Sequence, residues 1–256
     1  MIVLAHINAK GNAGYDKQIS FLQWSMKKYK IPAQLIVVYG EAKNEYAILK
    51  RKSESNRLYA ISDYIKKRNL LKEDIMILDP DTIFVKSMDQ SKYSLSEGTI
   101  RTQEYSRYID MFPEHKGIAE SVFGTNIKSA VCPFIGKGKT ISDLFDYSLY
   151  ALMGYYSKNL KSQWESGMYA IGAAMVKGNF NIIAENFWPV ANFHESDFKE
   201  NGYDGIHYGF EIQLKNKKSF KKWDSFSSFD SEPIDNKQHV SCKFIEHLKE
   251  FEKSRI

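Results

Sequence analysis

The stretch IMILDPDTIF, residues 75–84, decides how this chain folds. Its four consecutive apolar residues, 75–78, are typical of a strand buried on both faces, as in a parallel sheet. Pro80 has no backbone N–H to donate, so we expect strand pairing to end before it. Asp79 and Asp81 then follow the carboxyl end of the strand, which is where open α/β sheets bind ligands.

The two acids of this D-x-D motif predict a metal site. Two carboxylates at such a short separation repel each other unless a cation lies between them. A divalent metal ion that bridges a diphosphate is the simplest occupant. The alternative is an ordinary turn, because Asp and Pro are common turn residues. The position of Asp79 and Asp81 directly after an apolar strand favours the metal site.

Composition places the chain among soluble globular proteins. Its 256 residues suffice for one large α/β domain or two small ones, with 43% hydrophobic and 26% charged residues. A net charge of +5 suits an anionic ligand such as a nucleotide diphosphate. The lysines are scattered and form no basic arm, so we expect no nucleic-acid partner.

Cysteine content and the first residues predict a cytoplasmic location. Two cysteines exclude a disulfide framework and favour a reducing compartment. The chain opens on a strand-like run, residues 2–7, without the pattern of a signal peptide. No apolar stretch is long enough to span a membrane, so we expect no membrane segment.

The first part of the chain alternates strands and helices. Residues 2–7, 34–39 and 75–78 are strand-like. Two helices lie between them, with apolar residues spaced by three and four along one face; these residues are Tyr15, Ile19, Leu22 and Met26 in the first helix and Leu58, Ile61 and Ile65 in the second. This order predicts a parallel sheet.

The later part is less regular. Residues 89–130 are polar and predict short elements and loops. Further strands are predicted at 131–136, 182–183 and 205–208, and helices at 141–152, at 163–176 and from 241 onward. No low-complexity linker interrupts the chain, so we expect one domain of 1–256.

Several well-known site motifs are incomplete or missing. Gly138-Lys139-Thr140 is similar to the end of a phosphate-binding loop, but Pro133 stands where that motif needs a glycine. The chain also lacks G-x-G-x-x-G, H-E-x-x-H and C-x-x-C. These absences exclude a Walker-type ATP site and give no support to dinucleotide binding.

The acidic strand and the helix before it resemble a known enzyme family. Residues 56–60 (NRLYA) and 71–85 (LKEDIMILDPDTIFV) resemble the donor-binding core of GT-A glycosyltransferases. The closest likeness is to hydroxyproline O-arabinosyltransferases and peptidyl-serine galactosyltransferases. Three further segments resemble theirs in the same order: the helix with Tyr15, Gln18, Trp24 and Lys27-Lys28, the run 164–170 (WESGMYA), and His207-Tyr208-Gly209 followed by Lys215.

The resemblance implies a fold and an activity. The fold is α/β, a single Rossmann-like GT-A domain with a mixed, mostly parallel central sheet flanked by helices. Residues 1–88 are the nucleotide-binding half, and residues 89–256 bind acceptor and sugar. The activity is metal-dependent transfer of a hexosyl or pentosyl group, with retention, from a nucleoside-diphosphate sugar, in particular a UDP-sugar. The partner is a glycan or another hydroxyl-bearing acceptor.

The resemblance also assigns the metal ligands. Asp81 binds the metal directly and serves catalysis, whereas Asp79 binds the metal or contacts the ribose. His207 is the third protein ligand, and an imidazole beside carboxylates suits Mn²⁺ as well as Mg²⁺. The alternative for His207 is a hydrogen-bonded structural residue.

The remaining implied site residues bind nucleotide or acceptor. His6 and Asn8 end the first strand, where such folds bind the base. Arg57 contacts uracil or phosphate and Lys215 contacts phosphate, the alternative for both being a solvated charge. The catalytic acid of the family falls on glycine at position 167, and the nearest acid is Glu165, for which we expect an acceptor or sugar contact.

Two other functions stay open. A sugar nucleotidyltransferase also places acids at strand ends, but it usually needs a glycine-rich basic loop after the first strand, and residues 10–14 (KGNAG) match such a loop poorly. A non-catalytic nucleotide- or glycan-binding protein on the same fold is the third possibility.

Overall fold

The chain forms two compact units, seen here in a computed structural model. The structure describes residues 1–7, 13–40, 52–103, 131–157, 166–189, 202–208 and 240–255. The first unit contains residues 1–10, 33–78 and 89–185, and the second contains residues 11–32, 79–88 and 186–256. Both units contain residues from before and after residue 88. The assignment of nucleotide binding to residues 1–88, and of acceptor and sugar binding to residues 89–256, therefore stays a prediction.

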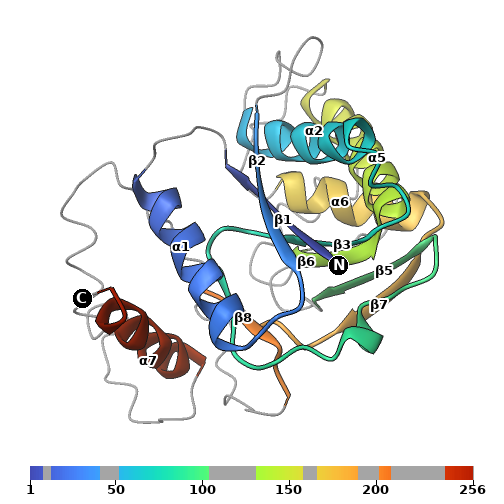
Figure 1. Cartoon of the computed structure of the whole chain (residues 1–256). Coiled ribbons are helices and arrows are strands. Elements are labelled where there is room, and N and C mark those ends of the chain that lie inside the picture. Colours follow the sequence, from blue (N-terminus) through green and yellow to red (C-terminus); the bar gives the residue numbers. More distant parts are fainter. Residues whose placement is uncertain are drawn as a thin grey trace. The chain divides into compact units, whose positions relative to one another are not determined.

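A six-stranded sheet forms the centre of the first unit (Figure 1). Its strands are β1 (Ile2–Ile7), β2 (Gln34–Tyr39), β3 (Asp74–Leu78), β5 (Thr99–Gln103), β6 (Val131–Lys137) and β7 (Asn181–Glu185), in the spatial order β2-β1-β3-β6-β5-β7. Strand β6 runs antiparallel to β3 and β5, and the other neighbouring strands are parallel. The predicted α/β fold with a mixed, mostly parallel sheet is therefore confirmed.

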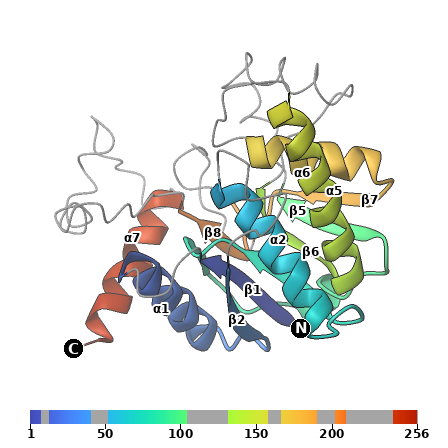
Figure 2. The ribbon, with the colours of Figure 1, turned by 90° about the horizontal axis from the view of Figure 1, so that it is seen from above.

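Three helices lie against one face of this sheet (Figure 1 and Figure 2). They are α2 (Lys52–Lys67), α5 (Gly138–Ser157) and α6 (Ser166–Lys177), and a 3₁₀ turn, η2 (Gln90–Lys92), belongs to the same unit. Alternate residues of a strand share a face, so Ile75 and Ile77 of β3 join one core with the helices. The predicted stripe of the second helix, Leu58, Ile61 and Ile65, is buried in this core.

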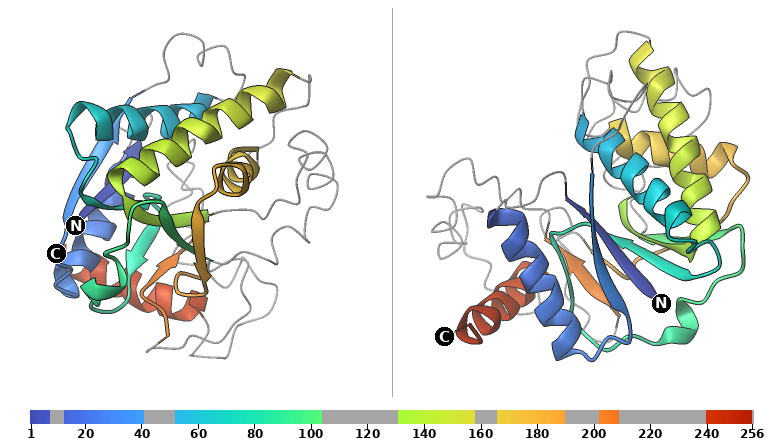
Figure 3. Two further views of the ribbon diagram at one scale, coloured as in Figure 1. Left: turned by 90° about the vertical axis from the view of Figure 1, so that its right-hand side faces the viewer. Right: turned by 45° about the horizontal axis from the view of Figure 1, so that its top comes forward.

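The described residues of the second unit form two helices and a short two-stranded sheet. Helix α1 (Ala13–Lys28) and helix α7 (Val240–Lys253) lie side by side (Figure 3). Strand β4 (Thr82–Phe84) pairs antiparallel with β8 (Gly205–His207). The core of this unit contains Phe21, Ile83, Val85, Tyr203, Ile206, Tyr208, Val240, Phe244, Leu248 and Phe251.

The structure adds one strand pairing that the sequence did not predict. Strand β3 ends at Leu78 as Pro80 predicts, and the residues that follow form β4 and join a different sheet. Strand β5, of five residues, lies in the segment 89–130, where short elements are predicted. Among the described helices, none is long and apolar enough to cross a lipid bilayer.

Candidate metal centre

The Asp-Pro-Asp turn that follows β3 presents two carboxylates. The hydroxyl of Thr82 donates a hydrogen bond of 2.7 Å to the backbone oxygen of Asp79, which closes the turn around Pro80. The side chains of Asp79 and Asp81 are 20% and 19% exposed. Two acids at such a short separation repel each other, and this repulsion favours a positive partner between them.

Strand pairing brings His207 to this turn. In the antiparallel register Thr82 lies opposite His207. The backbone N–H of Tyr208 donates to the backbone oxygen of Asp81 at 3.0 Å, and the N–H of His207 donates to the oxygen of Pro189 at 3.0 Å. These contacts hold the histidine backbone beside the acidic turn, although more than 120 residues separate the two in sequence.

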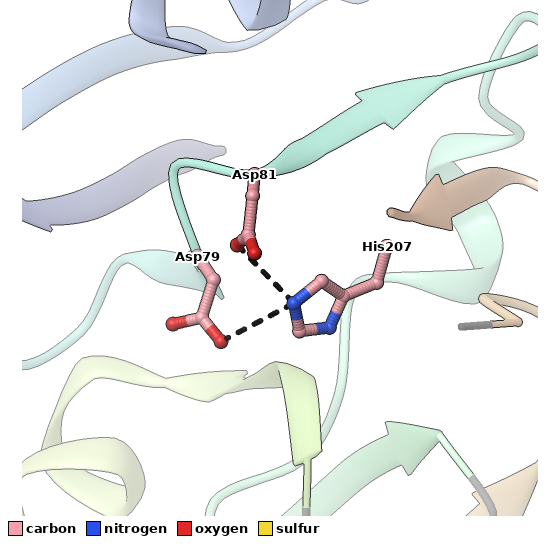
Figure 4. Close-up of side chains that lie close together, drawn as sticks. All are labelled: Asp79, Asp81 and His207. Atoms are coloured by element: carbon pink, nitrogen blue, oxygen red, sulfur yellow. Dashed lines mark ion pairs between the residues drawn. The ribbon is translucent and has the colours of Figure 1, made fainter. Parts of the chain in front are cut away.

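The three side chains converge (Figure 4). The Nε2 atom of His207 lies 3.2 Å from Oδ1 of Asp81 and 3.9 Å from Oδ2 of Asp79. One potential ligand atom from each residue lies within 4.8 Å of the other two. Ligands about 2.1 Å from one ion lie about 3.0 Å apart when adjacent in an octahedron and about 4.2 Å apart when opposite. Both measured distances fall in this interval, so the three residues fit a divalent metal ion.

The donor set also indicates which ions fit. Two carboxylate oxygens are hard ligands that Mg²⁺ and Mn²⁺ prefer, and an imidazole nitrogen is better suited to Mn²⁺. Three protein ligands would leave further coordination positions of an octahedral ion for substrate oxygens and water. A site of this kind can bind a diphosphate through the ion.

The negative charge of Asp81 affects the pKa of Tyr208, the residue that follows His207. Tyr208 is completely buried, and this burial raises the pKa of its hydroxyl well above the ordinary value. The negative charge of Asp81 raises the same pKa further. The phenol therefore stays neutral and adds no further negative charge next to the two carboxylates of the turn.

A close contact fixes the other end of β8. A Cβ atom built on Gly205 would lie 2.1 Å from the Trp188 indole, so only glycine fits beneath this ring. Trp188 is fully buried and packs edge-on against Phe84, with 5.0 Å between ring centroids. The sequence prediction missed these supporting residues, because a single glycine or tryptophan carries no signal of its packing partner.

Of the other predicted site residues, the structure describes His6 and Arg57, and both lie in the first unit. His6 is buried at the end of β1 in the first unit, and its Nε2 donates to the backbone oxygen of Gly40 at 3.0 Å. Arg57 is half-buried in α2 of the same unit. Asn8, Glu165 and Lys215 lie outside the described residues. The nucleotide and acceptor roles of these five residues stay predictions.

The first unit contains a cavity of about 410 Å³ beside β2 and α2. None of the predicted site residues that the structure describes lines it. Three tyrosines and three charged residues contribute to its wall, and the lining consists of Val38, Tyr39, Gly40, Tyr59, Ala60, Asp63, Tyr64, Lys67 and Arg68. Arg68 lies over the ring of Tyr64, 5.7 Å from its centroid.

Comparison with models of known protein families gave no match, and neither did comparison with curated proteins. The resemblance to GT-A glycosyltransferases therefore rests on the sequence segments quoted above. It stays a prediction, and the convergence of Asp79, Asp81 and His207 is the structural finding that bears on function.

Proposed function

We propose that this chain is a metal-dependent glycosyltransferase of the GT-A type. It transfers a hexosyl or pentosyl group, with retention, from a nucleoside-diphosphate sugar, in particular a UDP-sugar, to a hydroxyl of a glycan or another acceptor. The convergence of Asp79, Asp81 and His207 carries the proposal. Its position directly after a central strand of an α/β sheet supports the same function, because such sheets bind ligands at the carboxyl ends of their strands.

The three side chains have separate tasks. Asp79 and Asp81 supply two negative oxygen ligands, and together they balance the charge of one divalent cation. His207 supplies a neutral nitrogen through Nε2. A bound Mn²⁺ or Mg²⁺ would neutralise the negative charge that builds up on the diphosphate as it leaves the sugar. Asp79, Asp81 and His207 would hold the ion, and its remaining coordination positions would be available to oxygens of the leaving diphosphate.

Further roles follow from the resemblance alone. His6 and Asn8 contact the base, and Arg57 and Lys215 contact the base or the phosphates. Glu165 contacts the acceptor or the transferred sugar. The diphosphate itself accepts the proton of the acceptor hydroxyl, so the proposal does not require Glu165 to act as a nucleophile.

A panel of nucleotide sugars tests the proposal. The protein is incubated with Mn²⁺ and UDP-, GDP- or other nucleotide-activated sugars, and release of the free nucleotide diphosphate is measured. We expect slow hydrolysis of one donor in the presence of Mn²⁺, loss of this hydrolysis in EDTA, and loss in the Asp81→Asn variant.

Two other outcomes would replace the proposal. Tight nucleotide binding without hydrolysis, and without transfer to any acceptor, would indicate a non-catalytic binding protein. Formation of a nucleotide sugar from a nucleoside triphosphate and a sugar phosphate would indicate a nucleotidyltransferase. If neither Mn²⁺ nor any donor changed the free energy of unfolding, the hypothesis of a metal centre itself would be refuted.

A further inference from the structure

Tyr208 lies between the candidate metal ligands and the C-terminal helix. It follows His207 directly, and its backbone N–H donates to the oxygen of Asp81 at 3.0 Å. Its ring is fully buried and stacks on Phe244 of α7, with centroids 4.6 Å apart and an interplanar angle of 29°. One residue therefore contacts the acidic turn through its backbone and α7 through its side chain.

Helix α7 in turn packs against α1 and forms ion pairs with it. Phe251 stacks on Phe21 with 4.9 Å between centroids. Ion pairs join Lys28 to Glu250 and Lys17 to Glu252. These contacts lie in the second half of α7. Phe244, in the first half, stacks on Tyr208 and also contacts Phe21, with 6.0 Å between the centroids of the two phenylalanine rings. Of the two phenylalanines, Phe244 is therefore the one that contacts Tyr208 directly.

Tyr29, which follows α1 directly, adds a further contact to α7. The Tyr29 O–H donates to Nε2 of His247 at 2.6 Å, because Nδ1 of His247 donates to the oxygen of Lys243 at 2.7 Å. The position of α7 is therefore defined by hydrogen bonds as well as by apolar packing.

The small β4–β8 ribbon needs such support. Each strand has only three residues, and a two-stranded ribbon is at best marginally stable in water without packing. Ile83 and Ile206, which are paired in the ribbon, belong to the same core as Phe244. The geometry of the metal ligands therefore depends on what packs against this ribbon.

We infer that α7 is a positioning element of the metal centre, and that Tyr208 is the positioning residue through which it acts. The Phe244 ring fixes Tyr208, and Tyr208 fixes the backbone of both His207 and Asp81. This inference rests on the proposed metal-dependent function. It adds that the C-terminal helix, which supplies none of the three clustered ligands, sets the affinity of the centre.

A matched pair of variants on α7 tests the inference. Phe244→Leu removes the ring that stacks on Tyr208, and Phe251→Leu removes the ring that stacks on Phe21. Both side chains are buried, at 0% and 3% exposure, and both changes are chemically identical. Mn²⁺ alone is the probe: its affinity is measured from the electron paramagnetic resonance of the free ion, and stability is measured by urea unfolding.

The two variants should lose stability to a similar extent but differ in Mn²⁺ affinity. We expect Phe244→Leu to weaken Mn²⁺ binding by about 10-fold, the lower end of the loss caused by removing a residue that orients a metal ligand. Phe251→Leu should bind Mn²⁺ as the wild type does. Equal Mn²⁺ affinities in the wild type and Phe244→Leu would overturn the inference, and so would equal losses in both variants.

Tyr208 itself provides a second comparison, should Phe244→Leu fail to fold. Tyr208→Phe keeps the ring and the backbone N–H, so it should retain Mn²⁺ affinity. Tyr208→Leu loses the ring and should bind Mn²⁺ more weakly; wild-type affinity in this variant would overturn the inference. A wild-type protein that binds no Mn²⁺ would refute the proposed function, and the inference would fall with it.

Discussion

Replacing Asp81 by asparagine distinguishes a metal ligand from a structural ion-pair partner of His207. The change keeps the shape of the side chain and removes its charge. Asp79 and Asp81 offer oxygen atoms that lie within 4.8 Å of each other. Two negative charges at that distance repel by about 0.9 kcal/mol at the dielectric constant of water and by about 3.5 kcal/mol at an effective value of about 20.

The sign of the stability change is therefore informative. Both carboxylates are about one-fifth exposed, so we expect relief of about 1 kcal/mol when one charge is removed in EDTA. If Asp81 served mainly to pair with a charged His207, the same variant would lose stability. With Mn²⁺ at about 100 times its Kd, the wild type should gain about 2.7 kcal/mol and the variant nothing.

Urea unfolding in EDTA and in Mn²⁺ measures both effects, and Asp204→Asn is the matched control. Asp204 lies in the same unit, is buried, and pairs with Lys86 at 2.8 Å. This control should lose stability in EDTA and keep the full gain from Mn²⁺. An Asp81→Asn protein that is destabilised in EDTA, or that gains as much from Mn²⁺ as the wild type, would refute the metal-ligand assignment.

Four further predictions address separate parts of the molecule. His207→Ala should weaken Mn²⁺ binding by roughly 10- to 100-fold in calorimetry, since losing a proposed ligand should cost at least as much as losing a residue that orients one. Gly205→Ala should lower the free energy of unfolding in urea by about 3 kcal/mol, because its Cβ would lie 2.1 Å from the Trp188 ring. Burial lowers the pKa of His247 in the folded state, so on acidification the unfolded state binds a proton first. The free energy of unfolding should therefore be independent of this histidine above pH ~6.5 and should fall by up to about 1.4 kcal/mol per pH unit below it, until the folded pKa is reached. His247→Asn should flatten this slope. Glu165→Gln should slow glycosyl transfer and leave Mn²⁺ and UDP binding unchanged in titrations.

Local periodicity was enough to predict most elements of the fold. The stripe of Leu58, Ile61 and Ile65 predicts α2, and its members are buried as expected. The run 75–78 predicts a buried strand, and its four residues are at most 1% exposed. These predictions succeed because the spacing of apolar residues along a helix or strand is set by the geometry of that element alone.

Strand pairing could not be predicted in the same way. Strand β4 pairs with β8, more than 120 residues later, and β6 is inserted antiparallel between β3 and β5. Neither feature leaves a local pattern, because a pairing partner is chosen by the packing of the whole molecule. The convergence of His207 with Asp79 and Asp81 was accordingly expected only from the resemblance to a family, and not from the spacing of these residues.

The register of the β4–β8 ribbon is what brings the three candidate metal ligands together. A slip of one residue would turn every side chain of β8 to the opposite face, and His207 would then point away from the acidic turn. Two contacts oppose such a slip: the fit of Gly205 beneath Trp188 at one end, and the hydrogen bond from Tyr208 to Asp81 at the other. Since neither contact involves a metal ligand side chain, the affinity for Mn²⁺ should respond to changes in residues that never touch the ion.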